Sequence, residues 1–96
     1  AELGYQEHRS SALLQAELAK EGFKVTKGVA EIPTAFVAEW GRGGPVIAIL
    51  AEFDALPGVS QAAVPVKQAD TKPAAHACGH NLFGSGSVTA AIALSQ

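Results

Sequence analysis

The feature that most limits how this chain can fold is the uninterrupted apolar run Val46-Ile47-Ala48-Ile49-Leu50-Ala51. It follows the turn signal Arg42-Gly43-Gly44-Pro45, and such a run is typical of a strand covered on both faces. We therefore expect it to form the central strand of a sheet. The run is far shorter than the roughly 20 residues that cross a bilayer, so a membrane-spanning role is not expected.

Helices are expected before and after this strand. Ser10 and Ser11 precede a stretch rich in Ala and Leu that stops at Gly22, which predicts a helix over about residues 7 to 21. The small and aliphatic residues from Asn81 to Ser95 predict a second helix, buried and packed closely on the sheet. The expected fold class is therefore α/β, with a central sheet flanked by helices.

Two further segments carry strand and loop signals. Apolar and polar residues alternate loosely over residues 23–29 and 35–40, on either side of Ile32-Pro33-Thr34, which predicts a hairpin or two neighbouring strands. Residues 53–75 contain prolines and glycine among small and polar residues with no sustained period. They predict a long surface loop, and long ordered loops are often functional.

Size and charge exclude several classes of protein. The 96 residues allow one domain at most. Seven basic and nine acidic residues do not cluster by sign, so the chain lacks the charged footprint of a nucleic-acid binder. The single cysteine, Cys78, cannot form an internal disulfide, which favours a reducing compartment and a cytoplasmic location. The chain starts without Met and stops at Gln96 near the end of a predicted helix, so both ends are expected to be cut.

Three candidate metal ligands, His76, Cys78 and His80, alternate within five residues. Thiolate and imidazole are ligands that zinc prefers. An extended segment would turn all three to one side, whereas a helix beginning after Gly79 would direct His80 differently, so two of the three are expected to share a site. The alternative is that Cys78 is a small buried residue and the histidines make local hydrogen bonds.

A pair of carboxylates, Glu52 and Asp54, stands where the predicted central strand meets the long loop. The ends of strands in open sheets often carry ligand and catalytic groups. These carboxylates could bind a metal, act as a general base or orient a ligand histidine, or they could be a solvated strand end. The later Gly84-Ser85-Gly86-Ser87 lacks the phosphate-loop pattern, and close helix packing is the expected reason for its glycines.

Together, Glu52-Phe53-Asp54-Ala55-Leu56-Pro57-Gly58 and His76-Ala77-Cys78-Gly79-His80-Asn81 resemble a known family. They are similar to the aminoacylase and carboxypeptidase-like zinc metallopeptidases, in the amidohydrolase branch. Within that branch they resemble the aminobenzoyl-glutamate utilization protein B type of hydrolase. The resemblance covers nearly the whole chain, which is then expected to be the incomplete N-terminal part, residues 1–96, of a zinc-peptidase-like catalytic domain.

The resemblance implies that Cys78 and His80 are metal ligands and that Asp54 is the acidic catalytic residue supporting the site. It implies a divalent metal, zinc first and manganese second, and cleavage of the amide bond of N-acyl or aminobenzoyl amino acids or dipeptide-like substrates. A homodimer is expected for the full-length protein. The roles of Glu52 and His76 stay open.

The family places its general base, a pair of glutamates, and further histidine ligands beyond this motif. No Glu follows Glu52 and no His follows His80, so this chain alone is expected to be inactive. Two other interpretations remain open: a non-catalytic binding or assembly module that keeps the fold, and a reactive Cys78 thiol at a helix start.

Overall fold

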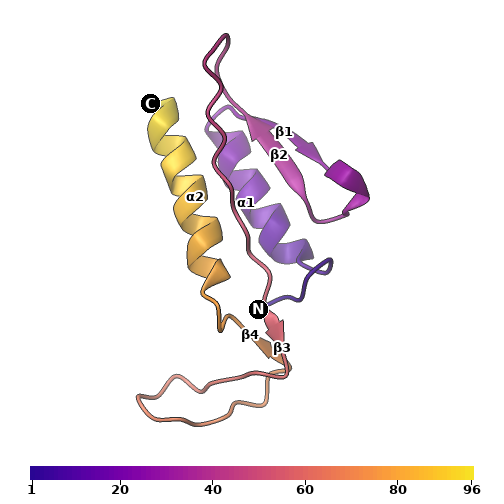
Figure 1. Cartoon of the computed structure of the whole chain (residues 1–96), viewed down its shortest axis with the longest axis vertical. Helices are drawn as coiled ribbons and strands as arrows, with labels where there is room; N and C mark the ends of the chain where they lie inside the picture. The colour runs from indigo at the N-terminus through magenta and orange to yellow at the C-terminus, as the bar shows by residue number, and fades with distance from the viewer.

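The computed structural model describes residues 1–96 as an elongated molecule of 50 × 29 × 21 Å. Two helices, α1 (His8–Lys20) and α2 (His80–Ser95), pack against each other, and a small hairpin covers α1 (Figure 1). Helices and strands are both present, as expected. The strands, however, form two separate two-stranded antiparallel sheets, so the chain is a small α+β unit.

Helix α1 confirms the prediction for residues 7 to 21 to within a residue at each end. Its Leu18 is buried, and Gly22, with φ +84°, follows its end. The residue at its N-terminal boundary, Glu7, makes no capping bond with its side chain. Instead, Glu2 accepts hydrogen bonds from the backbone N–H groups of Arg9 and Ser10, at 3.0 and 2.7 Å. A carboxylate from outside the helix therefore satisfies its free N–H groups.

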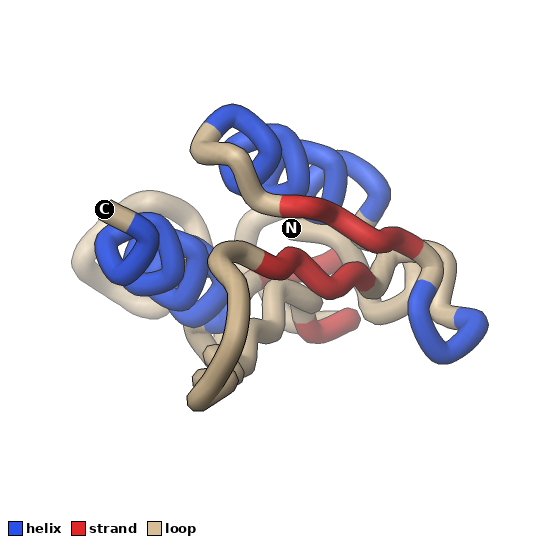
Figure 2. Tube along the Cα trace, turned by 90° about the horizontal axis from the view of Figure 1, so that it is seen from above, coloured by secondary structure: helices blue, strands red, loops and turns tan.

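The predicted hairpin is also confirmed. Strand β1 (Lys24–Lys27) pairs antiparallel with β2 (Phe36–Glu39), and a short 3-10 turn, η1 (Val29–Glu31), lies between them. Figure 2 shows the two strands lying beside α1. Thr34, in the connection, is buried and donates its hydroxyl hydrogen to the carboxylate of Glu7 at 2.6 Å. The hairpin is therefore tied to the start of α1 by polar bonds.

The long loop occupies the region expected for it. Its ends pair as β3 (Leu56–Pro57) and β4 (Ala74–Ala75), which close the loop at its base. Within the loop, the Ser60 hydroxyl bonds to the carbonyl of Asp70 at 2.8 Å and also accepts the Asp70 N–H. These bonds link the two sides of the loop, which projects beyond β3 and β4 at the bottom of Figure 1.

The prediction of a covered central strand at residues 46–51 is wrong for this chain. The segment joins no sheet, and Val46, Ile47 and Leu50 are 89%, 73% and 72% exposed. A strand needs a neighbour to pair its backbone groups, and no other strand of the chain lies beside this segment to do so. Its one bond to the rest is from the Ser87 hydroxyl to the Leu50 carbonyl, at 2.7 Å.

Helix α2 lies where it was predicted, but it is not buried on a sheet. Its buried residues are Gly84 and Val88, while Leu82 and Leu94 are 72% and 67% exposed. The helix packs on α1 and along the unpaired apolar segment, which run beside it in Figure 1. The two small sheets of this chain do not cover these side chains. Neither helix has the length and apolar character needed to cross a membrane.

Candidate metal centre

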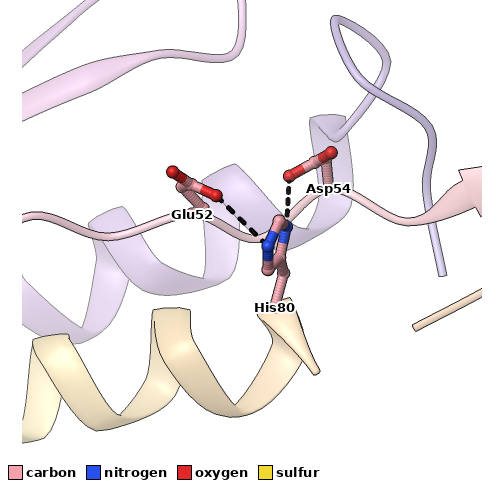
Figure 3. A group of neighbouring side chains, drawn as sticks. All are labelled: Glu52, Asp54 and His80. Carbon is pink, nitrogen blue, oxygen red and sulfur yellow. Dashed lines mark hydrogen bonds and ion pairs between the residues drawn. The ribbon is translucent and has the colours of Figure 1, made fainter. Parts of the chain in front are cut away.

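Three side chains from two distant parts of the sequence converge where the apolar segment ends. Glu52 and Asp54 follow that segment, and His80 is the first residue of α2. One ligand atom of each lies within 4.8 Å of those of the others (Figure 3). Oxygen and imidazole nitrogen donors in such a group are suited to a divalent cation.

The imidazole ring of His80 lies between the two carboxylates. Its Nδ1 is 2.7 Å from Asp54 Oδ1, and its Nε2 is 3.2 Å from Glu52 Oε2 (Figure 3). When the neutral ring donates its Nδ1 hydrogen to Asp54, Nε2 presents its lone pair toward Glu52. This is the arrangement in which a carboxylate fixes the tautomer of a metal-binding histidine.

A backbone contact after Asp54 and a side-chain contact at Phe53 hold the acidic segment in place. After Asp54, the Ala55 N–H donates to the Glu2 carbonyl at 2.8 Å, and Leu3 and Ala55 form a parallel bridge. Between the two acids, Phe53 stacks on Phe36 of the hairpin, with ring centroids 6.2 Å apart. The alternation therefore sends Phe53 to the hairpin and both carboxylates toward α2.

Glu2, whose carbonyl accepts the Ala55 N–H, is itself held by several hydrogen bonds. The carboxylate of Glu2 accepts the Ser10 hydroxyl hydrogen at 2.6 Å as well as the N–H groups of Arg9 and Ser10. The Ser10 hydroxyl, followed by the Arg9 N–H, lowers the pKa of Glu2 to about 2. The start of α1 and the acidic segment are consequently joined through one residue, by its side chain on one side and its carbonyl on the other.

A left-handed glycine begins the helix that carries the histidine. Gly79 has φ +77°, a conformation that residues with a side chain rarely adopt, and its N–H bonds to the His76 carbonyl at 3.2 Å. The turn separates Cys78 from His80. His80 enters the group with Glu52 and Asp54, whereas Cys78 is exposed and lies outside it.

The predicted site residues are thus brought together in part. Asp54 and His80 meet, and Glu52, whose role the sequence left open, joins them. The ligand role of Cys78 stays a prediction. His76 lies outside the group, and its buried Nδ1 has no hydrogen-bond partner. The alternate spacing of Glu52 and Asp54 was the signal that pointed to the pair.

The donor set fits a divalent cation of the zinc or manganese class. His80 Nε2 and the Glu52 carboxylate are the two groups free to contact such an ion directly while Asp54 holds the ring. A four-coordinate site would need further donors. The residues present could therefore hold part of a metal shell, with Asp54 as its supporting carboxylate.

A shallow hollow of about 220 Å³ adjoins the two carboxylates. Glu52 and Asp54 are among the residues that line it, and Phe36 and Phe53 are two of its five apolar lining residues. The lining combines apolar and aromatic residues with acidic ones, as small-molecule sites do, and His80 is not part of it.

Comparison with known proteins gives two relatives. The chain is 43% identical over 97 residues to one of the subunits of the p-aminobenzoyl-glutamate hydrolase of Escherichia coli (strain K12), an alignment that covers 99% of the chain. It is 35% identical over 103 residues to Xaa-Arg dipeptidase of Mus musculus, with 97% of the chain covered. The chain spans 20% of the length of each relative. No family profile matches the chain, and no solved structure does.

Proposed function

Because the chain is related by sequence to this amidohydrolase and peptidase family, of the aminobenzoyl-glutamate hydrolase type, we propose that it provides part of the metal centre of a metal-dependent amidohydrolase. The relationship confirms the resemblance carried by its two motifs. The proposed reaction is cleavage of the amide bond in N-acyl or aminobenzoyl amino acids.

The observation that carries the proposal is the placement of His80 between Asp54 and Glu52, at 2.7 and 3.2 Å. In the proposed site Asp54 accepts the Nδ1 hydrogen and keeps the ring oriented, while His80 Nε2 and Glu52 hold the ion. A divalent ion held there would polarise an amide carbonyl and lower the pKa of a water molecule. Zinc is the first choice and manganese the second.

Cys78 is proposed as a further ligand, on the strength of the motif alone. Its thiol is exposed and two residues from His80, so only the turn at Gly79 separates it from the group. Thiolate is a strong zinc ligand and a poor ligand for manganese. Participation of Cys78 would therefore favour zinc.

The hollow beside the carboxylates is proposed as the binding place for the apolar part of the substrate. Its walls contain the stacked rings of Phe36 and Phe53, which suit an aromatic or aliphatic acyl group. Glu52 and Asp54 also line the hollow, so a group bound there would lie beside the acidic segment. The orientation of the substrate would then be set by packing on one side and by charge on the other.

We also propose that the chain acts within a larger catalytic domain. It contains no Glu after Glu52 and no His after His80, so a general base of the expected kind and further histidine ligands would come from elsewhere in the protein. The exposed apolar segment at residues 46–51 supports this, because such surface is normally covered. The 96 residues alone are expected to show negligible hydrolysis. The full-length protein is expected to form a homodimer.

The test is hydrolysis of p-aminobenzoyl-glutamate and a set of N-acyl amino acids by the full-length protein, supplied with zinc or manganese. We expect turnover that His80→Ala abolishes and that His8→Ala, at an exposed histidine outside the group, leaves unchanged. Absence of turnover with either metal would refute the proposal. Stoichiometric metal without turnover would instead favour a non-catalytic binding module.

A further inference from the structure

Helix α2 lies close against the acidic segment at Gly84, one turn after His80. Gly84 is buried, and a Cβ atom added to it would lie 3.1 Å from the Phe53 Cβ and 3.2 Å from the Glu52 carbonyl oxygen. Both distances are shorter than ordinary van der Waals contact between such atoms. The absence of a side chain at Gly84 is therefore what lets the helix lie this close to Glu52 and Phe53.

The second glycine of the helix differs in this respect. A Cβ atom at Gly86 would meet nothing within 4 Å. Both glycines lie in the interior of α2, where glycine is less favourable than alanine. Close packing explains the use of glycine at Gly84 but not at Gly86. The two positions therefore form a matched pair on one helix.

The contacts at Gly84 have little freedom to relax. One is a backbone carbonyl oxygen and the other a Cβ atom, and neither can rotate aside as the end of a long side chain could. A methyl group at this position would consequently move the helix and the segment apart by a few tenths of an ångström. Hydrogen bonds weaken steeply outside a narrow range of distance and angle, so the 2.7 Å bond between His80 and Asp54 would respond to such a shift.

We propose that Gly84 is a positioning residue of the metal centre, and this rests on the proposed function of that site. By letting α2 lie against the Glu52 carbonyl, it sets the spacing at which the His80 ring fits between Asp54 and Glu52. The same two elements that touch at Gly84 carry all three members of the group (Figure 3). Gly84 is not itself a member of the group and acts through the placement of His80 beside Asp54 and Glu52.

The test compares Gly84→Ala with Gly86→Ala in the full-length protein. For Gly84→Ala we expect the Kd for zinc to rise by about 10- to 100-fold, the range for loss of support to a metal-binding histidine. For Gly86→Ala we expect a change within about twofold, because an exposed substitution touches nothing. Circular dichroism and thermal unfolding of both variants show that each is folded.

A metal-independent measurement accompanies it. In zinc-free protein with ¹⁵N-labelled histidine, NMR of the His80 ring should show the Nδ1 hydrogen bond weakened in Gly84→Ala and retained in Gly86→Ala. Equal spectra and equal zinc affinities in the two variants would overturn the inference. Failure of the wild type to bind zinc would refute the proposed function, and the ring spectra would still decide the role of Gly84.

Should Gly84→Ala not fold, the wild-type protein provides the second measurement. A close contact predicts a strong nuclear Overhauser effect between the Gly84 Hα atoms and the Phe53 Hβ atoms. Its presence would support the spacing on which the inference depends. Its absence would overturn it.

Discussion

The N-terminal 40 residues and the segment that follows them are held by different means. In the first region, Glu2 caps α1, Glu7 accepts the Thr34 hydroxyl hydrogen, and the Ser11 hydroxyl donates to the Thr34 carbonyl at 2.6 Å. In the second, residues 41–54 make no backbone–backbone hydrogen bond, and most of the apolar side chains of residues 46–51 are exposed. The first region pairs polar groups within itself, while the second leaves most of its backbone groups unpaired within the chain and most of its apolar side chains exposed. The side chains of Glu52, Asp54 and His80 lie where the second region meets α2.

The largest effect is expected where the second region meets α2. Asp54→Asn should weaken zinc binding by up to about 100-fold, because the neutral amide orients His80 less well. Asp70→Asn, in the long loop and outside the group, is the matched control and should leave binding unchanged. Competition titration against a zinc chelator measures both. Equal affinity of the two variants would contradict the supporting role of Asp54.

The polar ties of the first region predict the next effect. Thr34→Val removes the hydroxyl that bonds to Glu7 and leaves a buried carboxylate unpaired, which should lower the free energy of unfolding by ~2 kcal/mol. Thr26→Val makes the same change at an exposed position of β1 and should have little effect. Urea unfolding of the two variants measures the difference. Similar stabilities would show that the first region does not depend on these bonds.

Glu2 predicts a pH dependence of the same region. Its pKa is lowered from 4.5 to about 2 in the folded chain, so its contribution is fully present above pH 4.5 and is lost as the pH falls through about 2. Glu2→Gln should remove that acid-dependent loss and cost ~1 kcal/mol near neutral pH, as loss of a helix cap does. Unfolding curves at a series of pH values test this. An unchanged acid profile in Glu2→Gln would assign the pH dependence to other groups.

The smallest effect is expected in the second region. Ile47 is 73% exposed, so Ile47→Thr should change the stability of the 96-residue chain by less than about 0.5 kcal/mol. In the full-length protein the same substitution should cost ~1 kcal/mol or more if another part of the protein covers this segment. Denaturant unfolding of both forms measures the difference. Equal small effects in both would argue against such a cover.

The sequence predicted the structure of the first region better than that of the second. Helix α1 and the hairpin were predictable because their signals are local: Gly22 ends the helix, and alternating residues flank the break at Ile32-Pro33-Thr34. The apolar run at 46–51 carries the pattern of a covered strand, but covering depends on partners distant in sequence or outside the chain. The pattern therefore predicts a strand with covered faces, but it does not say whether this chain contains the partners that would cover it.

The sequence predicted most of the residues of the candidate metal centre, but it did not predict which of them lie together. The spacing of Glu52 and Asp54 placed them on one side, and His80 was a candidate ligand from its motif. Which of His76, Cys78 and His80 would meet the acids depends on the left-handed turn at Gly79 and on the approach of α2 at Gly84. Neither can be derived from residue type alone.

The central claim is that His80, oriented by Asp54, holds a divalent ion together with Glu52. A crystal structure of the zinc-loaded full-length protein, with anomalous data at the zinc edge, tests it most directly. We predict a zinc peak about 2.0–2.2 Å from His80 Nε2 and from a Glu52 carboxylate oxygen, with Asp54 bonded to Nδ1. Zinc bound without His80, or no peak beside His80, would contradict the claim.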